Sequence, residues 1–115
     1  MKDCKVNVLG TEYTIEFKEE NEDKLFSEAN GYCDYTGRRI VVLANPRKDD
    51  DIDNWEFEQK RIVRHELTHA FLCESGLIGN TYCVDNGWAK NEEMVDWFAI
   101  QSPKMFKAFH ELEIL

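Results

Sequence analysis

The order of the expected elements indicates an α+β fold, with strands in the first half of the chain and helices in the second. Two observations predict this arrangement. Short runs rich in β-branched and aromatic residues, separated by turn residues, extend to about residue 43. From about residue 54 onward, the apolar residues follow helical spacing instead. A chain of 115 residues has room for one modest core, so we expect a single compact domain over residues 1–115.

The first half of the chain contains the signals of two β-hairpins. In each of them, two short strand-forming runs flank a turn that contains glycine. The runs and turns are, in chain order, residues 6–8, Leu9-Gly10 and 11–17, and then residues 32–35, Thr36-Gly37 and 38–43. The polar stretch between the hairpins, residues 19–29, is expected to form a short helix or a loop. We therefore expect a small, mostly antiparallel sheet.

The second half of the chain is expected to be helical. A long helix is predicted from about residue 54 to residue 75, where Gly76 is a typical stop signal. Residues 77–90 contain several Gly and Asn residues and are expected to form a loop. A second helix begins near Asn91, and Ser102-Pro103, a capping serine followed by proline, indicates the start of a third. We expect the sheet to pack against the long helix, with two further helices at the C-terminal end.

The long helix carries His65-Glu66-Leu67-Thr68-His69, an H-E-x-x-H motif. Residues four apart on a helix share one face, with Cβ atoms about 6 Å apart, so both imidazoles can reach one metal ion. Glu66 lies beside this pair and is better placed to accept a proton from water than to bind the metal. A surface helix with solvated histidines is the alternative. The apolar residues that surround the motif on nearly every side argue against it.

The motif supplies only two of the three protein ligands that a catalytic zinc site usually has. Metzincins place another histidine six residues after the motif, but here that position is Ser75. The last histidine, His110, lies in a separate C-terminal segment. We therefore expect a carboxylate from the second helix to complete the site.

Glu92 and Asp96 are four residues apart on that second helix and share a face. We expect Glu92 to bind zinc and Asp96 to accept the N–H of a ligating histidine, His65, and so to fix its tautomer. Glu93 points about 100° away around the helix and is the alternative ligand. Acidic residues also favour the positive end of a helix, so the pair at 92 and 93 has a structural explanation as well.

H-E-x-x-H followed by a second helix with the sequence Glu92 to Ala99 resembles the compact gluzincin metallopeptidases, in particular the ImmA/IrrE-type peptidases of phages and mobile elements. The resemblance covers residues 61–100. It implies a zincin-like fold, one catalytic Zn²⁺ held by His65, His69 and Glu92, and a peptide or protein substrate. Val95-Asp96 stands where the family usually has Ala-Asn, and the aspartate is more similar to the thermolysin-type arrangement.

The mechanism we expect is metal-assisted peptide hydrolysis. Zinc lowers the pKa of its bound water to about 7 and polarises the scissile carbonyl, and Glu66 takes the proton and passes it to the leaving amine. Larger gluzincins stabilise the developing oxyanion with a histidine or tyrosine. Here Tyr82 and His110 are the candidates, although neither belongs to a motif for that role.

An edge strand beside the cleft pairs with extended substrate in this clan. Residues 38–43 are the expected counterpart, because they precede the zinc helix and are rich in β-branched residues. The run Ile40–Leu43 fits a fully buried central strand equally well, so both interpretations stay open.

Composition argues against several other classes of protein. A net charge of −9 opposes binding to phosphates, so no nucleic-acid partner is expected. No apolar run is long enough to span a bilayer and no signal-peptide region is present, so we expect a cytoplasmic protein without a membrane partner. Four cysteines without a C-x-x-C pair are expected to be reduced thiols: Cys4, Cys33, Cys73 and Cys83.

The alternative function is a zinc-containing, non-catalytic interaction module of the anti-repressor or toxin–antitoxin kind. Glu66 favours the enzyme, because a carboxylate at that position has little use in a purely structural zinc site. Oligomeric state and the identity of the substrate have no signature in the sequence.

Overall fold

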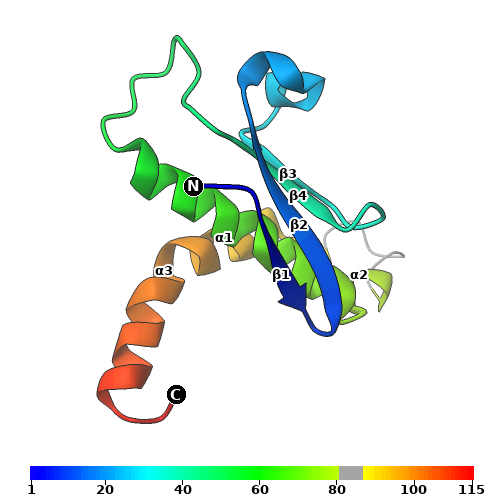
Figure 1. Cartoon of the computed structure of the whole chain (residues 1–115). Helices are drawn as coiled ribbons and strands as arrows, with labels where there is room; N and C mark the ends of the chain where they lie inside the picture. Colours follow the sequence, from blue (N-terminus) through cyan, green and yellow to red (C-terminus); the bar gives the residue numbers. More distant parts are fainter. Residues whose placement is uncertain (81–86) are drawn as a thin grey trace.

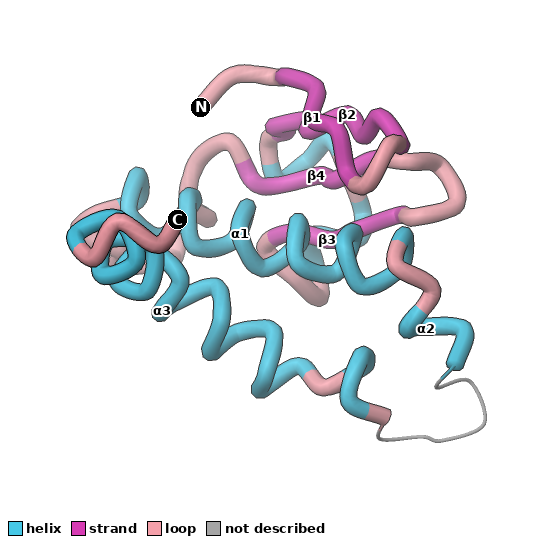
Figure 2. Tube along the Cα trace, turned by 90° about the horizontal axis from the view of Figure 1, so that it is seen from below, coloured by secondary structure: helices cyan, strands magenta, loops and turns pink. Residues whose placement is uncertain are grey.

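The computed structural model describes residues 1–80 and 87–115. As predicted, the fold is α+β, and it contains a four-stranded sheet followed by helices (Figure 1). Helix α1 (Trp55–Glu74) lies between the sheet on one side and helix α3 (Glu92–Glu111) on the other (Figure 2). Tyr82 and Cys83 lie outside the described residues.

The two predicted hairpins are confirmed. Strands β1 (Cys4–Val8) and β2 (Thr11–Lys18) pair antiparallel, and so do β3 (Gly31–Asp34) and β4 (Arg39–Leu43). The β1–β2 turn places Leu9 at φ 51° and Gly10 at φ 94°. Two consecutive positive φ angles match the right-handed twist of a two-residue hairpin, and glycine adopts the second at little cost.

The strand order is β1-β2-β4-β3, and β2 pairs with β4 in parallel. The sheet is therefore mixed, with two antiparallel pairings and one parallel pairing, which agrees with the predicted mostly antiparallel sheet. Of the two interpretations left open for residues 38–43, the edge strand is wrong and the central strand is confirmed, because β4 is central and β3 occupies the edge. The four residues Ile40–Leu43 are all buried, as expected for a strand that is covered on both faces.

Each face of the sheet has its own apolar cluster. One face packs against α1 in the main core, whose buried members are Val8, Tyr13, Ile15, Ile40, Val42, Ile62, Val63 and Ala70. On the opposite face, Val41 and Leu43 pack with Phe26. Phe26 lies in the polar stretch after β2, which forms two short 3-10 helices, Glu20–Glu22 and Lys24–Ser27. Because β4 contributes to both clusters, it lies at the centre of the packing.

Helix α1 has well-defined ends. The Asn54 side chain accepts a hydrogen bond of 3.0 Å from the main-chain N–H of Phe57 and caps the first turn. Gly76 at φ 85° follows the last turn, which confirms the predicted stop. The buried Gln59 donates a hydrogen bond of 2.8 Å to the carbonyl oxygen of Leu43 and so fixes α1 against the end of β4.

The C-terminal region differs from the prediction of two separate helices. After the single-turn helix α2 (Leu77–Asn80) and a 3-10 turn at Trp88–Lys90, α3 runs without a break over 20 residues. Ser102 and Pro103 lie inside this helix rather than at the start of a new one. The carbonyl oxygen of Ala99, which the proline leaves without its main-chain donor, instead accepts a hydrogen bond from the side chain of Arg64 on α1.

Helices α1 and α3 each contain 20 residues, but charged side chains are distributed along both. Among residues 1–80 and 87–115, no helix is apolar enough over a sufficient length to cross a membrane.

Candidate metal centre

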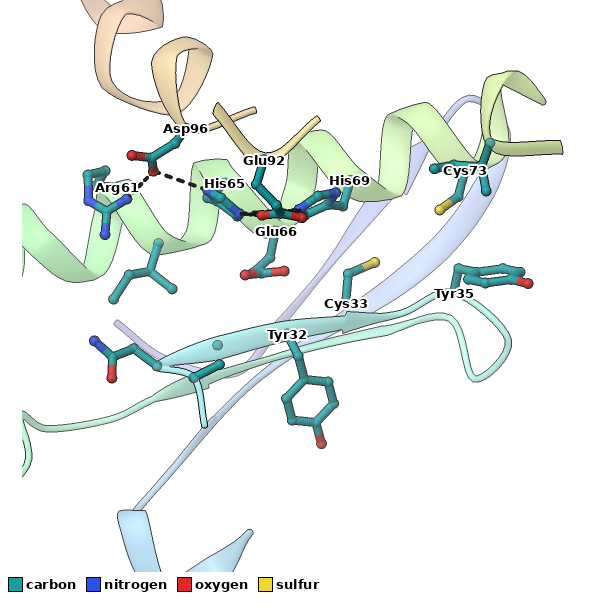
Figure 3. Close-up of a pocket in the computed structure, with 15 residues that line it drawn as sticks. Tyr32, Cys33, Tyr35, Arg61, His65, Glu66, His69, Cys73, Glu92 and Asp96 are labelled. Atoms are coloured by element: carbon teal, nitrogen blue, oxygen red, sulfur yellow. Dashed lines mark hydrogen bonds and ion pairs between the residues drawn. The ribbon is translucent and has the colours of Figure 1, made fainter. Parts of the chain in front are cut away.

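The H-E-x-x-H motif lies in the second half of α1, and its histidines share one face of the helix as the spacing predicts. The rings of His65 and His69 are 4.9 Å apart between centroids. The first residue of α3, Glu92, lies directly opposite them (Figure 3). The structure therefore brings together three side chains that come from two helices.

The possible ligand atoms of these three residues converge on one point. The Nε2 atom of His65 is 3.0 Å from a carboxylate oxygen of Glu92, and the Nε2 atom of His69 is 3.1 Å from the other oxygen. The two Nε2 atoms are 3.2 Å apart. A tetrahedral zinc ion with bonds of about 2.0 to 2.1 Å holds its ligand atoms about 3.3 Å apart. The donor set and its spacing thus fit a zinc ion, and the three residues form a group that could hold one.

Asp96 lies one turn after Glu92 on the same face of α3. Its Oδ1 atom is 3.1 Å from Nδ1 of His65. A proton on Nδ1 that is donated to this carboxylate leaves the Nε2 lone pair of His65 free to bind a metal. The predicted pairing of Asp96 with His65 is therefore present in the structure.

Glu93, the alternative third ligand, lies elsewhere. It is exposed and does not line the cleft that contains the histidines, whereas Glu92 does. Glu92 and Glu93 face different directions because consecutive helical residues point about 100° apart. Of the two carboxylates, the structure brings Glu92 to the histidines.

Glu66 is buried beneath the two histidines, with 8% of its surface exposed. Burial raises the pKa of Glu66 to about 7, and the negative charge of Glu92 adds to this effect, while His65 and Arg61 oppose it. A carboxyl group whose pKa lies near neutrality is well suited to exchange protons in a reaction at neutral pH. Burial also lowers the pKa of His69, which favours the neutral imidazole that binds metals.

The candidate centre opens into a cleft of about 640 Å³ between α1, β3 and the start of α3 (Figure 3). One ridge of α1 forms the floor, with Arg61, His65, His69 and Cys73 at successive intervals of four residues and with Ile62 and Glu66 beside them. The facing wall comes from β3 and the turn that follows, and includes Gly31, Cys33 and Tyr35. The phenol of Tyr32 points away from the cleft, and its hydroxyl donates a hydrogen bond to Asp23.

Gly31 allows the edge strand to lie close to α1. A Cβ atom at this position would lie 2.8 Å from Cγ2 of Ile62 and 3.2 Å from the carbonyl oxygen of Val41. Real Cβ atoms do not approach other atoms as closely as the first of these distances. The close contact at Gly31 therefore sets the separation of the two walls at this end of the cleft.

Of the two predicted oxyanion stabilisers, the structure describes only His110, and it lies away from the centre. Tyr82 lies outside the described residues. His110 lies in the last turn of α3, 18 residues after Glu92, which corresponds to about 27 Å of helix. It lines a separate hollow with Glu113 and Leu115.

Several cleft residues were not predicted as site residues. Arg61 could have been found, because it precedes His65 by four positions and so shares its face of the helix. Cys33 and Tyr35 belong to the edge strand and its turn, and their place at the cleft depends on the sheet order. Cys73, which was predicted to be a reduced thiol, also lines the cleft. Among the described residues, Cys4, Cys33 and Cys73 are free thiols.

Comparison of the chain with protein-family models, with curated proteins and with solved structures finds no match.

Proposed function

We propose that the protein is a zinc metallopeptidase of the gluzincin type, with a zincin-like fold, that hydrolyses peptide bonds in a peptide or protein substrate. One observation carries this proposal. His65, His69 and Glu92 converge with the spacing of zinc ligands, directly beside a buried carboxyl group, in a cleft that is open to solvent. A structural zinc site needs neither the acid–base group nor the cleft.

The chemistry divides between the ion and the protein. A zinc ion at this position acts as a Lewis acid, which lowers the pKa of water and polarises a carbonyl group. Glu66, buried beside the three ligands, accepts the proton of the attacking water and returns it to the leaving amine. Asp96 holds the His65 ring in the tautomer that presents Nε2 to the centre.

Strand β3 is the proposed docking edge for the substrate. It pairs with β4 on one side only, and its other side faces the cleft. An extended peptide that adds to this edge receives main-chain hydrogen bonds and lies across the three ligands. The proposed edge is therefore β3 rather than residues 38–43.

The second candidate function is a zinc-containing interaction module without turnover. It is supported by the position of His110, which lies far along α3 from the centre and provides no oxyanion stabiliser there. In that case the cleft recognises a partner segment, and Glu66 has no proton to transfer.

One set of measurements separates the two functions. Zinc content is measured on the purified protein, and zinc-loaded protein is incubated with a peptide library whose products are identified by mass spectrometry. We expect about one zinc per chain, cleavage by the unsubstituted protein, and retained zinc without cleavage in Glu66→Gln. The matched control is Glu93→Gln, which removes an exposed carboxylate near the centre and should cleave normally.

Three other results would contradict the proposed peptidase activity or the role of Glu66 in it. Stoichiometric zinc without cleavage of any library member supports the interaction module. Absence of bound zinc contradicts both functions. Cleavage that persists in Glu66→Gln shows that another group is the base or that a contaminating peptidase is present.

A further inference from the structure

Arg61 occupies one end of the α1 ridge that floors the cleft, one turn before His65. Its side chain is 23% exposed, and its guanidinium group lies in the seam between α1 and α3. It is the one cationic side chain among the described residues that line the cleft. The chemistry proposed above assigns it no part.

The guanidinium group connects two carboxylates. On one side, its Nε and Nη2 atoms donate to the Glu58 carboxylate, with distances of 3.0 Å from Nε to Oε2 and 2.6 Å from Nη2 to Oε1. On the other side, Nη1 donates to Oδ1 of Asp96. This same oxygen is 3.1 Å from Nδ1 of His65 (Figure 3). A chain of contacts therefore runs from Glu58 through Arg61 and Asp96 to a candidate zinc ligand.

This arrangement constrains the Asp96 carboxylate. Its side chain is 42% exposed, so on an isolated helix it would have several rotamers available. The rigid guanidinium fork is held by Glu58 at one edge and presents Nη1 at a fixed place on α1. The Oδ1 atom of Asp96 meets that donor and the His65 ring at once.

We propose that Arg61 is a positioning residue of the metal centre, which holds the Asp96 carboxylate in the orientation that fixes the tautomer of His65. By the same contact it ties α3 to α1 one turn after Glu92, so that Glu92 faces the two histidines. The effect on zinc binding rests on the proposed function. The effect on the His65 ring does not, because the contacts are made by the protein alone.

Arg61 could also act only by linking α1 to α3. The test must therefore measure the tautomer of the His65 imidazole and not only the stability of the fold. We would record long-range ¹H–¹⁵N spectra of the imidazoles in the metal-free protein at about pH 8. The control variant is Lys60→Gln, because Lys60 neighbours Arg61 on α1 but pairs with Glu56, 2.7 Å away, on the exposed side. His110 serves as an internal reference within each spectrum.

The expected spectra are distinct. His65 carries its proton on Nδ1 in the unsubstituted protein and in Lys60→Gln, and becomes a mixture of tautomers in Arg61→Gln, while His110 does not change. Arg61→Lys keeps the charge but lacks the fork, so we expect a smaller shift in the same direction. If Arg61→Gln does not fold, Arg61→Lys decides the question. An unchanged His65 tautomer in a folded variant overturns the proposal.

Zinc affinity gives the second readout, measured by competition with a chromophoric chelator. We expect Arg61→Gln to weaken binding by about 10- to 100-fold and Lys60→Gln to leave it unchanged. Because Arg61 acts through Asp96, adding Arg61→Gln to Asp96→Asn should cause no further loss, and additive losses would overturn the proposal. If the unsubstituted protein binds no zinc, the proposed function fails, and the spectra of the metal-free protein still decide the role of Arg61.

Discussion

The Nε atom of Arg64 on α1 donates a hydrogen bond of 2.6 Å to the main-chain carbonyl oxygen of Ala99 on α3. In a regular helix this oxygen would accept from the N–H of the residue four positions later. That residue is Pro103, which has no N–H. A side chain from the neighbouring helix thus supplies the missing donor, and α3 continues through the proline.

This relationship predicts that Arg64 stabilises the fold mainly because Pro103 lacks an N–H. Arg64→Met keeps most of the aliphatic length but leaves the Ala99 oxygen without a donor, which should lower the free energy of unfolding by about 1 to 3 kcal/mol. Pro103→Ala restores a main-chain N–H and should remove most of that loss. Urea unfolding of the four proteins in this double-mutant cycle measures the coupling. An equal cost of Arg64→Met in both backgrounds would show that the proline is not what Arg64 compensates.

Zinc should stabilise the fold through Glu92 and not through Glu93. A ligand present at about 100 times its dissociation constant adds about 2.7 kcal/mol to the free energy of unfolding, which corresponds to roughly 10 °C in Tm for a domain of this size. We expect the Tm to fall by about that amount on chelation of the unsubstituted protein and of Glu93→Ala. Glu92→Ala should show little response to zinc or to chelator. The reverse pattern would make Glu93 the third ligand.

The buried Glu66 should make the metal-free protein less stable as the pH rises. Burial raises its pKa from 4.5 to about 7, so folding favours the protonated form. The stability that this preference contributes is fully present below pH 4.5 and is lost as the pH rises through 7. Glu66→Gln has no such titration. The variant should therefore be more stable than the unsubstituted metal-free protein at about pH 8, by up to about 3 kcal/mol.

The measurement is chemical denaturation of both metal-free proteins across this pH range. The difference between them should shrink to near zero toward pH 4.5, whatever other groups do to both proteins. A difference that does not change with pH would mean that Glu66 titrates normally.

Gly31 should be sensitive to substitution in a way that a surface glycine is not. In Gly31→Ala the new methyl group meets Ile62 and the Val41 carbonyl oxygen at distances that force β3 away from α1, at a cost of about 1 to 3 kcal/mol. The control is Gly79→Ala, where a Cβ atom meets nothing within 4 Å. Thermal unfolding should show a lower Tm for the first variant and little change for the second. Equal Tm values would show that the strand moves freely relative to the helix.

The parts of the structure that were predicted from the sequence depend on local periodicity. The spacing of four residues placed His65 with His69, and Glu92 with Asp96, on shared helix faces, and the structure has both arrangements. The first hairpin and the end of α1 followed from Gly10 and Gly76, both of which have a positive φ. In the second hairpin the positive φ falls on Arg38, next to the predicted Gly37. These features are set by residues within a few positions of one another.

The errors concern contacts between distant segments. The run Ile40–Leu43 is compatible with an edge or a central strand, and the parallel pairing of β2 with β4 decides the matter. Ser102-Pro103 has the local pattern of a helix start, but the residues lie inside α3. There Arg64, 39 residues before the proline, donates to the Ala99 oxygen that the proline leaves without a donor. In both cases the deciding group is far away in sequence, where periodicity carries no information.

The side chains on the floor of the cleft must stay in register along α1, because they come from positions four residues apart. One residue inserted between Glu66 and His69 would turn everything that follows by about 100°, so that the two imidazoles would no longer face a common point. Insertions in residues 45–53, ahead of the helix, leave the spacing of these side chains unchanged. The spacing of the candidate ligands on α1 therefore tolerates no change in length, whereas the loop that precedes the helix does.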